Sequence, residues 1–255
     1  MVSAEEITYD IVIPSMNVNG IEPVVLKCLQ TIREYSKNYC LYFVQNGDDL
    51  YDSVADELAL HKNVYIIQNE DNLGFVKAVN QGLLESTSPF VVVMNNDTEA
   101  VPHWLEKLRA PLVHKYALSG PSTTTPDSWQ GRCSRGISPV RLPVGHMLAF
   151  FCVMIRRDAL LSVGVLDEDF GIGFGDDDNY SARAQAQGFG LVYVPEIVIP
   201  HHHRTTFKLV YSEDEIQRMQ NSALTLHFDK LKGISKAIHH SQERLYREHL
   251  QKIKG

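Results

Sequence analysis

Three adjacent aspartates are the groups in this chain most able to do chemistry. Asp176, Asp177 and Asp178 lie between glycines and a helical run, in the stretch GFGDDDNYSARAQAQG. Like charges in contact repel, so this arrangement must be offset by its surroundings. Acidic side chains in the first turn of a helix favour the positive end of the helix dipole, which is a purely structural explanation. The alternative is that the carboxylates bind a cation or act as a general base.

Two further segments carry groups that could bind a metal ion. Asp97, in MNNDTE, follows an apolar run, where a carboxylate could hold Mg²⁺ or Mn²⁺ together with substrate phosphates, or could simply form a turn. His201, His202 and His203 follow VYVPEIVIP. Strand alternation would place His201 and His203 on one face, but two imidazoles alone make a poor zinc site. A single imidazole joining Asp97 on a divalent cation is the more economical hypothesis, and a solvated strand end is the alternative.

The elements that must position these groups alternate in period along the first hundred residues. Short apolar runs typical of buried strands are separated by amphipathic segments of helical spacing. The expected strands are 9–14, 40–45, 63–69 and 89–94, and the expected helices are 22–35, 51–60 and 74–86. This alternation predicts βαβ units, and therefore an α/β fold with a mostly parallel central sheet flanked by helices.

Polar residues follow each of the four expected strands, at Ser15–Asn17, Gln45–Asp48, Asn69–Asn72 and Asn95–Thr98. Open α/β sheets bind ligands at the carboxyl ends of their strands, so we expect these stretches to meet in one hydrophilic crevice. The chain has no GxGxxG after the first strand and no GxxxxGK[ST]. Dinucleotide and P-loop phosphate sites are therefore disfavoured.

The second half is less regular. Residues 120–145 are rich in Pro, Gly, Ser and Thr, which predicts a long loop of the kind that often binds ligands. Further on, we expect strands at 150–155 and 191–200, and helices at 156–164, 178–188 and from Ser212 onward.

Composition and charge exclude several classes of protein. The net charge of −7 argues against a general nucleic-acid binder. The four cysteines show no CxxC spacing, which favours free thiols over a zinc knuckle. The N-terminus carries Glu5 and Glu6 where a signal peptide would be basic, and the longest apolar run, Met147–Ile155, is too short to span a bilayer. We therefore expect a cytoplasmic protein without a transmembrane segment.

The order of these pieces resembles family 2 of the nucleotide-sugar glycosyltransferases, which have the GT-A fold. The resemblance runs from about Tyr9 to Phe207. It rests on DIVIPSMN, NLGFVKAVNQG, VVVMNNDTE, VMIRRDALLSVGVLDEDFGIGFGDDDNYSAR and VYVPEIVIPH. It implies a GT-A domain over 1–211, with a nucleotide-sugar-binding half (1–98) and an acceptor and catalytic half (99–211). A helical C-terminal extension would follow over 212–255.

The resemblance also implies a reaction. It is the metal-assisted, inverting transfer of a sugar from a nucleoside-diphosphate sugar, expected to be a UDP-sugar, to an acceptor hydroxyl. Asp177 matches the position of the family's general base, and Asp176 matches the preceding Glu. Asp97 would hold Mn²⁺ or Mg²⁺, with His201 or, alternatively, His203 as its partner.

Seven residues are implied in donor binding: Ser15, Asn17, Gln45, Asn72, Lys77, Asn96 and Asp97. Gln45 occupies a position where the family often has an Asp that pairs with uracil, and Gln can both donate and accept hydrogen bonds. Lys77 could reach a donor phosphate, or could lie on a solvated helix face.

Two other functions remain open. One is a catalytically inactive sugar-nucleotide-binding or scaffold protein, because Asn95 and Asn179 replace aspartates of the family motifs. The other is a nucleotidyltransferase, although SMNVNGIEP has one glycine and no basic residue where such enzymes usually have a glycine-rich basic loop.

The acceptor is not specified by the sequence. It could be a glycan, a lipid-linked glycan, a protein, a small molecule or a modified nucleobase. We expect it near Trp129 or His146, whose rings could stack on a sugar or a base. The basic C-terminal helix could form a homo-oligomer, touch an anionic membrane or nucleic acid, or be simply solvated.

Overall fold

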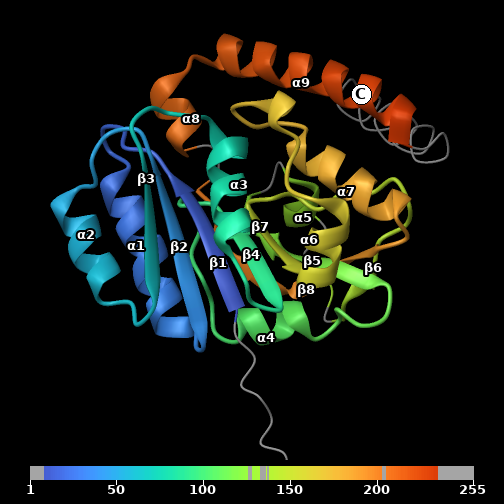
Figure 1. The fold of residues 1–255 in the computed structure, drawn as a ribbon, viewed down its shortest axis with the longest axis horizontal. Helices are drawn as coiled ribbons and strands as arrows, with labels where there is room; N and C mark the ends of the chain where they lie inside the picture. Colours follow the sequence, from blue (N-terminus) through green and yellow to red (C-terminus); the bar gives the residue numbers. More distant parts are fainter. Residues whose placement is uncertain (1–8, 126–127, 133–135, 137, 203–204, 235–255) are drawn as a thin grey trace, which may run out of the picture.

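The structure is a computed structural model that describes residues 9–125, 128–132, 136, 138–202 and 205–234. The described residues form a sheet of eight strands in the order β3-β2-β1-β4-β7-β5-β8-β6 (Figure 1). Its strands are β1 (Tyr9–Ser15), β2 (Tyr39–Asn46), β3 (Val64–Asn69), β4 (Phe90–Met94), β5 (Tyr116–Thr123), β6 (Val140–Arg141), β7 (Cys152–Arg156) and β8 (Gly190–Ile199). The pairs β3-β2, β2-β1, β1-β4 and β5-β8 are parallel, whereas β7 and β6 run antiparallel to their neighbours. The expected mostly parallel sheet is confirmed.

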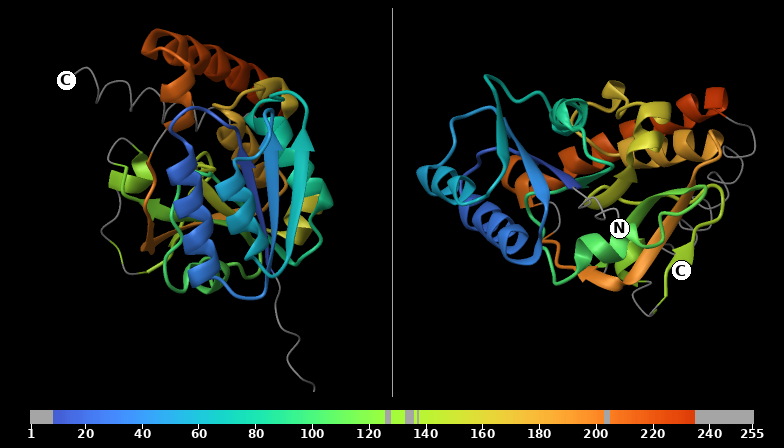
Figure 2. Two further views of the ribbon diagram at one scale, coloured as in Figure 1. Left: turned by 90° about the vertical axis from the view of Figure 1, so that its left-hand side faces the viewer. Right: turned by 60° about the horizontal axis from the view of Figure 1, so that its bottom comes forward.

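Helices cover both faces of the sheet. They are α1 (Glu22–Tyr35), α2 (Asp52–Ala59), α3 (Phe75–Glu85), α4 (Trp104–Arg109), α5 (Trp129–Arg132), α6 (Arg157–Val163), the 3-10 helix η1 (Glu168–Phe170), α7 (Asp176–Ala186), α8 (Thr205–Val210) and α9 (Glu213–Ile234). Apolar side chains of α1, α2 and α4 pack on one face, and those of α3, α6 and α7 pack on the other. The result is a three-layer α/β architecture (Figures 1 and 2).

The first strand shows how the sequence builds this core. Ile11 and Ile13 belong to the cluster formed with α1, and Val12 belongs to the cluster formed with α3, as alternation along a strand requires. Helix α3 lies so close to β1 that a Cβ at Gly82 would be 2.4 Å from Cγ1 of Val12. A glycine inside a helix is destabilising by itself, so the close approach explains why this one is present.

The expected loop over 120–145 is wrong for residues 120–123, which belong to β5, and for the short elements α5 and β6. The small polar side chains of β5 are buried, and the hydroxyls of its two serines donate to nearby carbonyls. Ser119 Oγ bonds the carbonyl of Leu108 at 2.7 Å, and Ser122 Oγ bonds that of Gln130 at 2.8 Å. The register of β5 against β8 shifts between Pro121 and Ser122, which accommodates a proline within the sheet.

The helix expected from Ser212 onward is present as α9, and residues 235–255 lie outside the described part of the chain. Helix α9 lies across the top of the molecule, at the edge where the parallel strands end (Figures 1 and 2). Its Ile216 and Leu231 are buried. Lys230 Nζ lies 2.6 Å from a carboxylate oxygen of each of Asp167 and Asp169, at η1. The expected domain limits remain a prediction.

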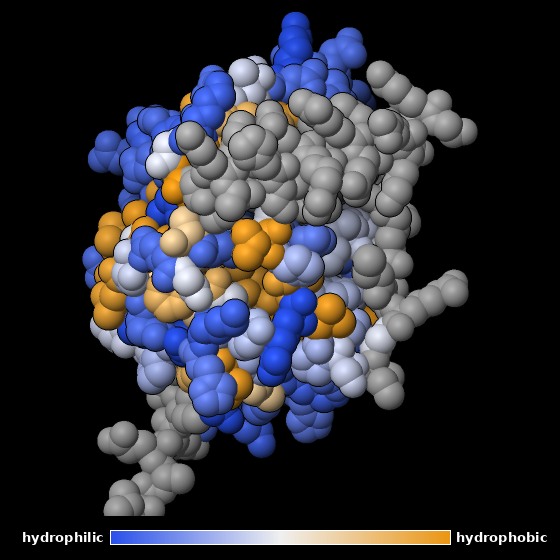
Figure 3. Space-filling model, turned by 90° about the vertical axis from the view of Figure 1, so that its right-hand side faces the viewer, coloured by the Kyte–Doolittle hydropathy of each residue, from blue (hydrophilic) through white to orange (hydrophobic). Residues whose placement is uncertain are grey.

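The structure bears on two of the sequence-based expectations, the absence of a transmembrane segment and the formation of an oligomer. Within the described ranges, the structure contains no helix with the length and apolar character needed to cross a membrane. On the face drawn in Figure 3, hydrophobic side chains of the described residues are interrupted by hydrophilic ones. Val140 and Val144 are among the exposed large hydrophobic residues of the chain. The expected oligomer through the C-terminal helices stays a prediction.

Candidate active site

A cavity of about 800 Å³ lies between the carboxyl ends of the strands and α9, within the size range of small-molecule sites. Its lining comes from many parts of the chain, among them the ends of β1 and β2, the start of α3, the loop after β4, the segments before β7 and after β8, the start of α7 and the inner face of α9. Residues from these parts include Ser15, Asn95, Asn96, Asp97, Asp176, Asp177, Asp178, Gln217, Gln220 and Asn221. The sheet therefore brings Ser15, Asn96 and Asp97 to one crevice, as the strand-end rule predicts.

Asp97 and His201 meet in this cavity. Oδ1 of Asp97 lies 3.2 Å from Nε2 of His201, and both side chains are largely buried. The backbone N–H of Thr205 donates to Oδ2 of Asp97 at 3.3 Å. Burial raises the pKa of the Asp97 carboxyl, but His201 and the Thr205 N–H outweigh burial, so that the pKa lies below its ordinary value. Asp97 is therefore an ionised carboxylate at neutral pH.

The ring of His201 is held in place by packing and by its backbone. It stacks on Phe151, with ring centroids 5.0 Å apart and planes 13° from parallel. The backbone N–H of His201 donates to Thr124 Oγ1, and its carbonyl accepts from Thr125 Oγ1. His202 is different, because its half-exposed ring lies 2.9 Å from Glu99 and does not line the cavity. His203 lies outside the described residues.

The Asp97–His201 pair fits a divalent cation that takes its remaining ligands from substrate. Adjacent ligands of an octahedral ion with bonds of about 2.1 Å lie roughly 3 Å apart, which matches the separation of Oδ1 and Nε2. The described residues contain no cluster of three or more His, Cys, Asp or Glu side chains able to hold a metal ion. An ion held here would therefore depend on phosphate oxygens or water, as Mg²⁺ commonly does.

The three aspartates occupy the first turn of α7. Phe174 and Gly175 both have positive φ, +71° and +75°, and this left-handed turn directs the chain into the helix. Asp176, Asp177 and Asp178 all line the cavity. The Asp178 N–H donates to Asp177 Oδ1 at 2.9 Å. These carboxylates therefore border the cavity and also lie at the positive end of the helix dipole.

Burial and mutual repulsion raise the pKa values of these carboxyl groups. Burial raises the pKa of Asp176, and the neighbouring charge of Asp177 raises it further. The pKa of Asp177 is raised by burial and by the charge of Asp178. Raised pKa values near neutrality are what a carboxylate needs to accept a proton in catalysis and release it afterwards.

Asn179, which replaces an aspartate of the family motif, has a structural role here. Its Oδ1 accepts from Nε of Arg183 at 2.9 Å. The guanidinium of Arg183 also donates to the carbonyls of Val163 and Val165, at 2.8 and 2.7 Å. Asn179 thus orients the arginine that anchors α7 to the preceding segment, and its own side chain does not line the cavity.

Three of the expected donor-binding residues sit in hydrogen-bond networks at the strand ends. Ser15 Oγ accepts from Asn96 Nδ2 at 3.0 Å, which joins the ends of β1 and β4. Asn72 Oδ1 accepts from Asn46 Nδ2 at 2.7 Å and from the N–H of Gly74 at 2.9 Å. Ser15, Asn72 and Asn96 all line the cavity. These networks order the loops that border the crevice.

The other three expected donor-binding residues lie away from the cavity lining. Asn17 is half-buried and bonds the carbonyl of Asp49. Gln45 is buried and donates to the carbonyl of Asp48 at 2.7 Å, while its Oε1 is buried and makes no hydrogen bond within the described chain. Lys77 is exposed on α3. The structure therefore does not bring Asn17, Gln45 or Lys77 into contact with the cavity.

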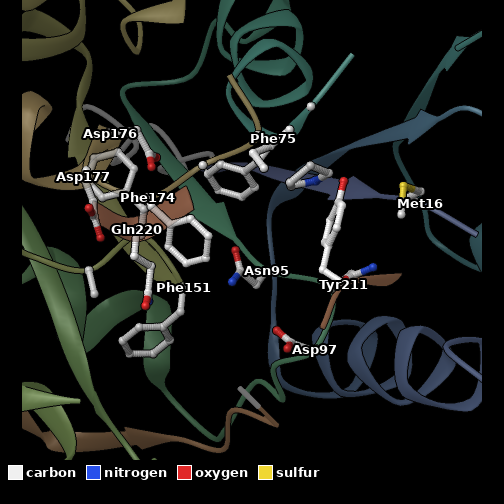
Figure 4. A pocket seen from close by; sticks show the side chains of 18 of the residues that line it. Met16, Phe75, Asn95, Asp97, Phe151, Phe174, Asp176, Asp177, Tyr211 and Gln220 are labelled. Carbon is white, nitrogen blue, oxygen red and sulfur yellow. The ribbon is translucent and has the colours of Figure 1, made fainter. Parts of the chain in front are cut away.

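Sequence reasoning missed the aromatic and amide side chains of the site. Figure 4 shows Phe75, Phe151, Phe174, Tyr211 and Gln220 around the cavity. Asp97 and Tyr211 lie toward one side of this view, Asp176 and Asp177 lie toward the other, and Asn95 lies between them. Aromatic residues are usually part of a core and amides usually face water, so neither type carries a local signal for a site. Trp129 and His146, by contrast, do not line the cavity.

Solved structures of similar fold define the class to which this architecture belongs. The mannosyltransferase PcManGT from Pyrobaculum calidifontis, in complex with GDP-Man and Mn²⁺, matches with a TM-score of 0.69 at 15% identity over 92% of this chain and 68% of that one. TarS 1-349 from S. aureus, in complex with UDP-GlcNAc, matches with a TM-score of 0.70 at 11% identity over 92% and 69%. GalNAc-T7 with UDP, GalNAc and Mn²⁺ matches with a TM-score of 0.65 at 14% identity, over 78% of this chain but only 44% of that one. The fold is that of the GT-A glycosyltransferases.

The family model for glycosyl transferase family 2 matches residues 10–164, more than half of the chain. The chain belongs to this family. A search of curated proteins gives no match. The matched segment contains Ser15, Asn72 and Asp97, whereas Asp177 and His201 lie beyond it.

Proposed function

We propose that the protein transfers a sugar from a nucleoside-diphosphate sugar to an acceptor hydroxyl by a single displacement with inversion. The observation that carries this proposal is that the Asp97–His201 pair and the Asp176–Asp177 pair line one cavity at the carboxyl ends of the strands. Membership of glycosyl transferase family 2 supports the same reaction class. The first pair is suited to the donor diphosphate, and the second is suited to the acceptor hydroxyl.

Asp97 and His201 would hold a divalent cation, Mn²⁺ or Mg²⁺, together with the donor diphosphate. When bound, the cation supplies positive charge that offsets the negative charge developing on the leaving diphosphate. This role matters because no lysine or arginine is among the described residues that line the cavity. PcManGT and GalNAc-T7, which share the fold, are themselves complexes with Mn²⁺.

Asp177 acts as the general base in this proposal. Its carboxylate removes the proton of the acceptor hydroxyl as the oxygen attacks the anomeric carbon and the bond to the diphosphate oxygen breaks. The proton remains on Asp177, the electron pair of the broken bond leaves with the nucleoside diphosphate, and the anomeric configuration inverts. Burial and the charge of the adjacent Asp178 keep the proton affinity of Asp177 high, and the charge of Asp177 in turn raises the pKa of the buried Asp176.

We assign the nucleoside of the donor to the side of the cavity bordered by Ser15, Asn96 and Asn72. Gln45 is outside the cavity lining, but its buried Oε1 makes no hydrogen bond within the described chain, so that this amide would accept from a base N–H only if the base reached beyond the lining. UDP is the first nucleotide to test, because TarS and GalNAc-T7 are complexes with UDP compounds. GDP is the second, since PcManGT holds GDP-Man.

A thermal-shift panel tests the proposal directly. We would measure the melting temperature with UDP, GDP, TDP, CDP and ADP, each with and without Mn²⁺. A ligand that binds only the folded state stabilises it by about 2.7 kcal/mol at a hundredfold excess over its Kd. We expect one nucleotide to raise the melting temperature in a Mn²⁺-dependent way. If no diphosphate does so under either condition, the donor site is wrong and a non-catalytic role takes its place.

A further inference from the structure

Helix α9 is fixed over the catalytic end of α7. A Cβ at Gly175 would lie 3.3 Å from the carbonyl oxygen of Ala223, so the two helices approach closely where the aspartates begin. At its other end, α9 is fastened by the ion pairs of Lys230 with Asp167 and Asp169. Near the start of the helix Ile216 is buried, so the part of α9 between Ile216 and Ala223 also has a defined position relative to Asp176 and Asp177.

The side of α9 that faces the cavity offers uncharged hydrogen-bonding groups. Gln217, Gln220, Asn221 and Leu224 all line the cavity, and their spacing of three and four residues places them on one face of the helix. Gln217 Nε2 donates to Asn221 Oδ1 at 3.2 Å, which orients both amides. An amide side chain donates and accepts, as recognition of a hydroxyl group requires.

Aromatic rings border the same region. In Figure 4, Phe174 and Gln220 lie on the side of the cavity where Asp176 and Asp177 are found. Phe151 also lines the cavity, and one face of its ring stacks on His201. Flat apolar rings beside a few polar groups are typical of sites that orient a ring-shaped ligand. A sugar ring has apolar C–H faces and a polar edge. It can therefore pack on the aromatic rings and form hydrogen bonds with the polar groups at the same time.

Charge disfavours an anionic ligand at this end. Asp176, Asp177 and Asp178 all line it, and no lysine or arginine is among the lining residues that the structure describes. A phosphate placed here would be repelled by the carboxylates in a partly desolvated space. The ligand that fits is uncharged close to its reacting hydroxyl.

From these observations we infer that α9 forms one wall of an acceptor subsite for an uncharged sugar, with Gln220 and Asn221 bonding its hydroxyl groups. This inference rests on the proposed transferase function and names the class of its acceptor. It selects a neutral glycoside over a sugar phosphate or a base within nucleic acid.

The first test compares acceptors with the unaltered protein. Release of nucleoside diphosphate from UDP-glucose, UDP-galactose, UDP-N-acetylglucosamine and GDP-mannose is measured with Mn²⁺, alone and with added acceptor. The neutral acceptors are the methyl glycosides of glucose, galactose, N-acetylglucosamine and mannose. We expect at least one to accelerate release and to appear in a glycosylated product, and glucose 6-phosphate to be a poorer acceptor. Faster transfer to glucose 6-phosphate, or to duplex DNA carrying 5-hydroxymethylcytosine, would overturn the inference.

The second test uses variants of α9. Gln220→Ala combined with Asn221→Ala should raise the KM for the best glycoside about tenfold, the loss expected for one or two hydrogen bonds between uncharged groups. Ser222→Ala, an exposed change on the same helix outside the cavity lining, is the matched control and should leave this KM unchanged. If the double variant and the control give the same KM for the glycoside, α9 does not recognise the acceptor.

The results distinguish failure of the acceptor subsite from failure of the transferase function. If no nucleotide binds and no donor is cleaved, the transferase proposal itself fails. If a nucleotide binds with Mn²⁺ and its sugar is slowly hydrolysed, but none of the four methyl glycosides accelerates release, the transferase proposal stands and the neutral-sugar subsite is wrong.

Discussion

Oδ1 of Asp97 and Nε2 of His201 lie 3.2 Å apart, although the two residues are more than one hundred positions apart in the chain. An isolated antiparallel bridge between Thr98 and His201 brings their backbones together. The pair is therefore held by a backbone bridge just beyond the ends of β4 and β8. Its geometry leads to the first prediction.

Removing either member of this pair should abolish metal-dependent nucleotide binding. We expect His201→Ala to lose the Mn²⁺-dependent part of the thermal shift with nucleotide, and Asp97→Asn to do the same. His202→Ala is the matched control, because His202 is half-exposed and pairs with Glu99 outside the cavity. A His201→Ala protein whose shift still depends on Mn²⁺ to the same extent would remove His201 as a ligand.

Asp177→Asn should lower kcat strongly while the nucleotide still binds. General base catalysis contributes about 10²- to 10⁴-fold, so a loss of that size is expected in the rate of sugar transfer. The comparison is Asp229→Asn, since Asp229 is exposed and pairs only with Lys232 among the described contacts. A normal kcat in the Asp177→Asn protein would assign the base to another group.

The pH dependence of activity should follow the raised pKa of Asp177. Burial and the charge of Asp178 raise this pKa to about 7. Because the base must be ionised, kcat should fall by about tenfold per pH unit below that value and level off above it. The acid limb should be absent from the residual activity of Asp177→Asn. An acid limb centred near pH 4 would show that Asp177 is not shifted in the working enzyme.

Stability should change with pH in the opposite direction. Burial, with the charge of Asp177, raises the pKa of Asp176 to about 8 in the folded state, well above the value of about 3.9 in an unfolded chain. The folded state thus binds more protons between these values. The contribution of this group is fully present below about pH 4 and is lost as the pH rises toward 8. Urea unfolding across this range should show a smaller loss for Asp176→Asn than for the unaltered protein.

Gly175→Ala should destabilise the fold more than Gly188→Ala. Both glycines have positive φ, +75° and +89°, so each substitution costs about 1–2 kcal/mol in backbone strain. Only at Gly175 would the added Cβ be crowded, at 3.1 Å from Phe170 and 3.3 Å from the Ala223 carbonyl, which adds about 1–3 kcal/mol. Equal free energies of unfolding for the two variants would show that α9 does not press on this position.

Much of the first half of the fold is predictable because its signals are local. The strands and helices from Tyr9 to Met94 match the expected ones within about two residues, since each is a run of one clear period. Strand β5 is not predictable in this way. Its serines and proline resemble a loop, and only the carbonyls of Leu108 and Gln130, which accept from Ser119 and Ser122, make their burial possible.

The residues of the candidate site also differ in whether the sequence predicts them. Asp97, Asn96 and Ser15 follow apolar strands, so the rule for strand ends finds them. Gln220 and Asn221 carry no such signal, because amides along a helix usually face water. Their place beside the aspartates depends on contacts between α9 and α7 that are remote in sequence. Lys77 shows the converse, because its position in a motif gives no indication that its side chain is exposed on α3.

The position of α9 along the chain has an evolutionary consequence. The family model ends at residue 164, whereas α9 begins at Glu213. In the proposed function, the strand ends that border the donor side and the helix that borders the acceptor side are thus separate stretches of the gene. A change within this 22-residue helix would then alter the choice of acceptor while Ser15, Asn96 and Asp97 stay in place.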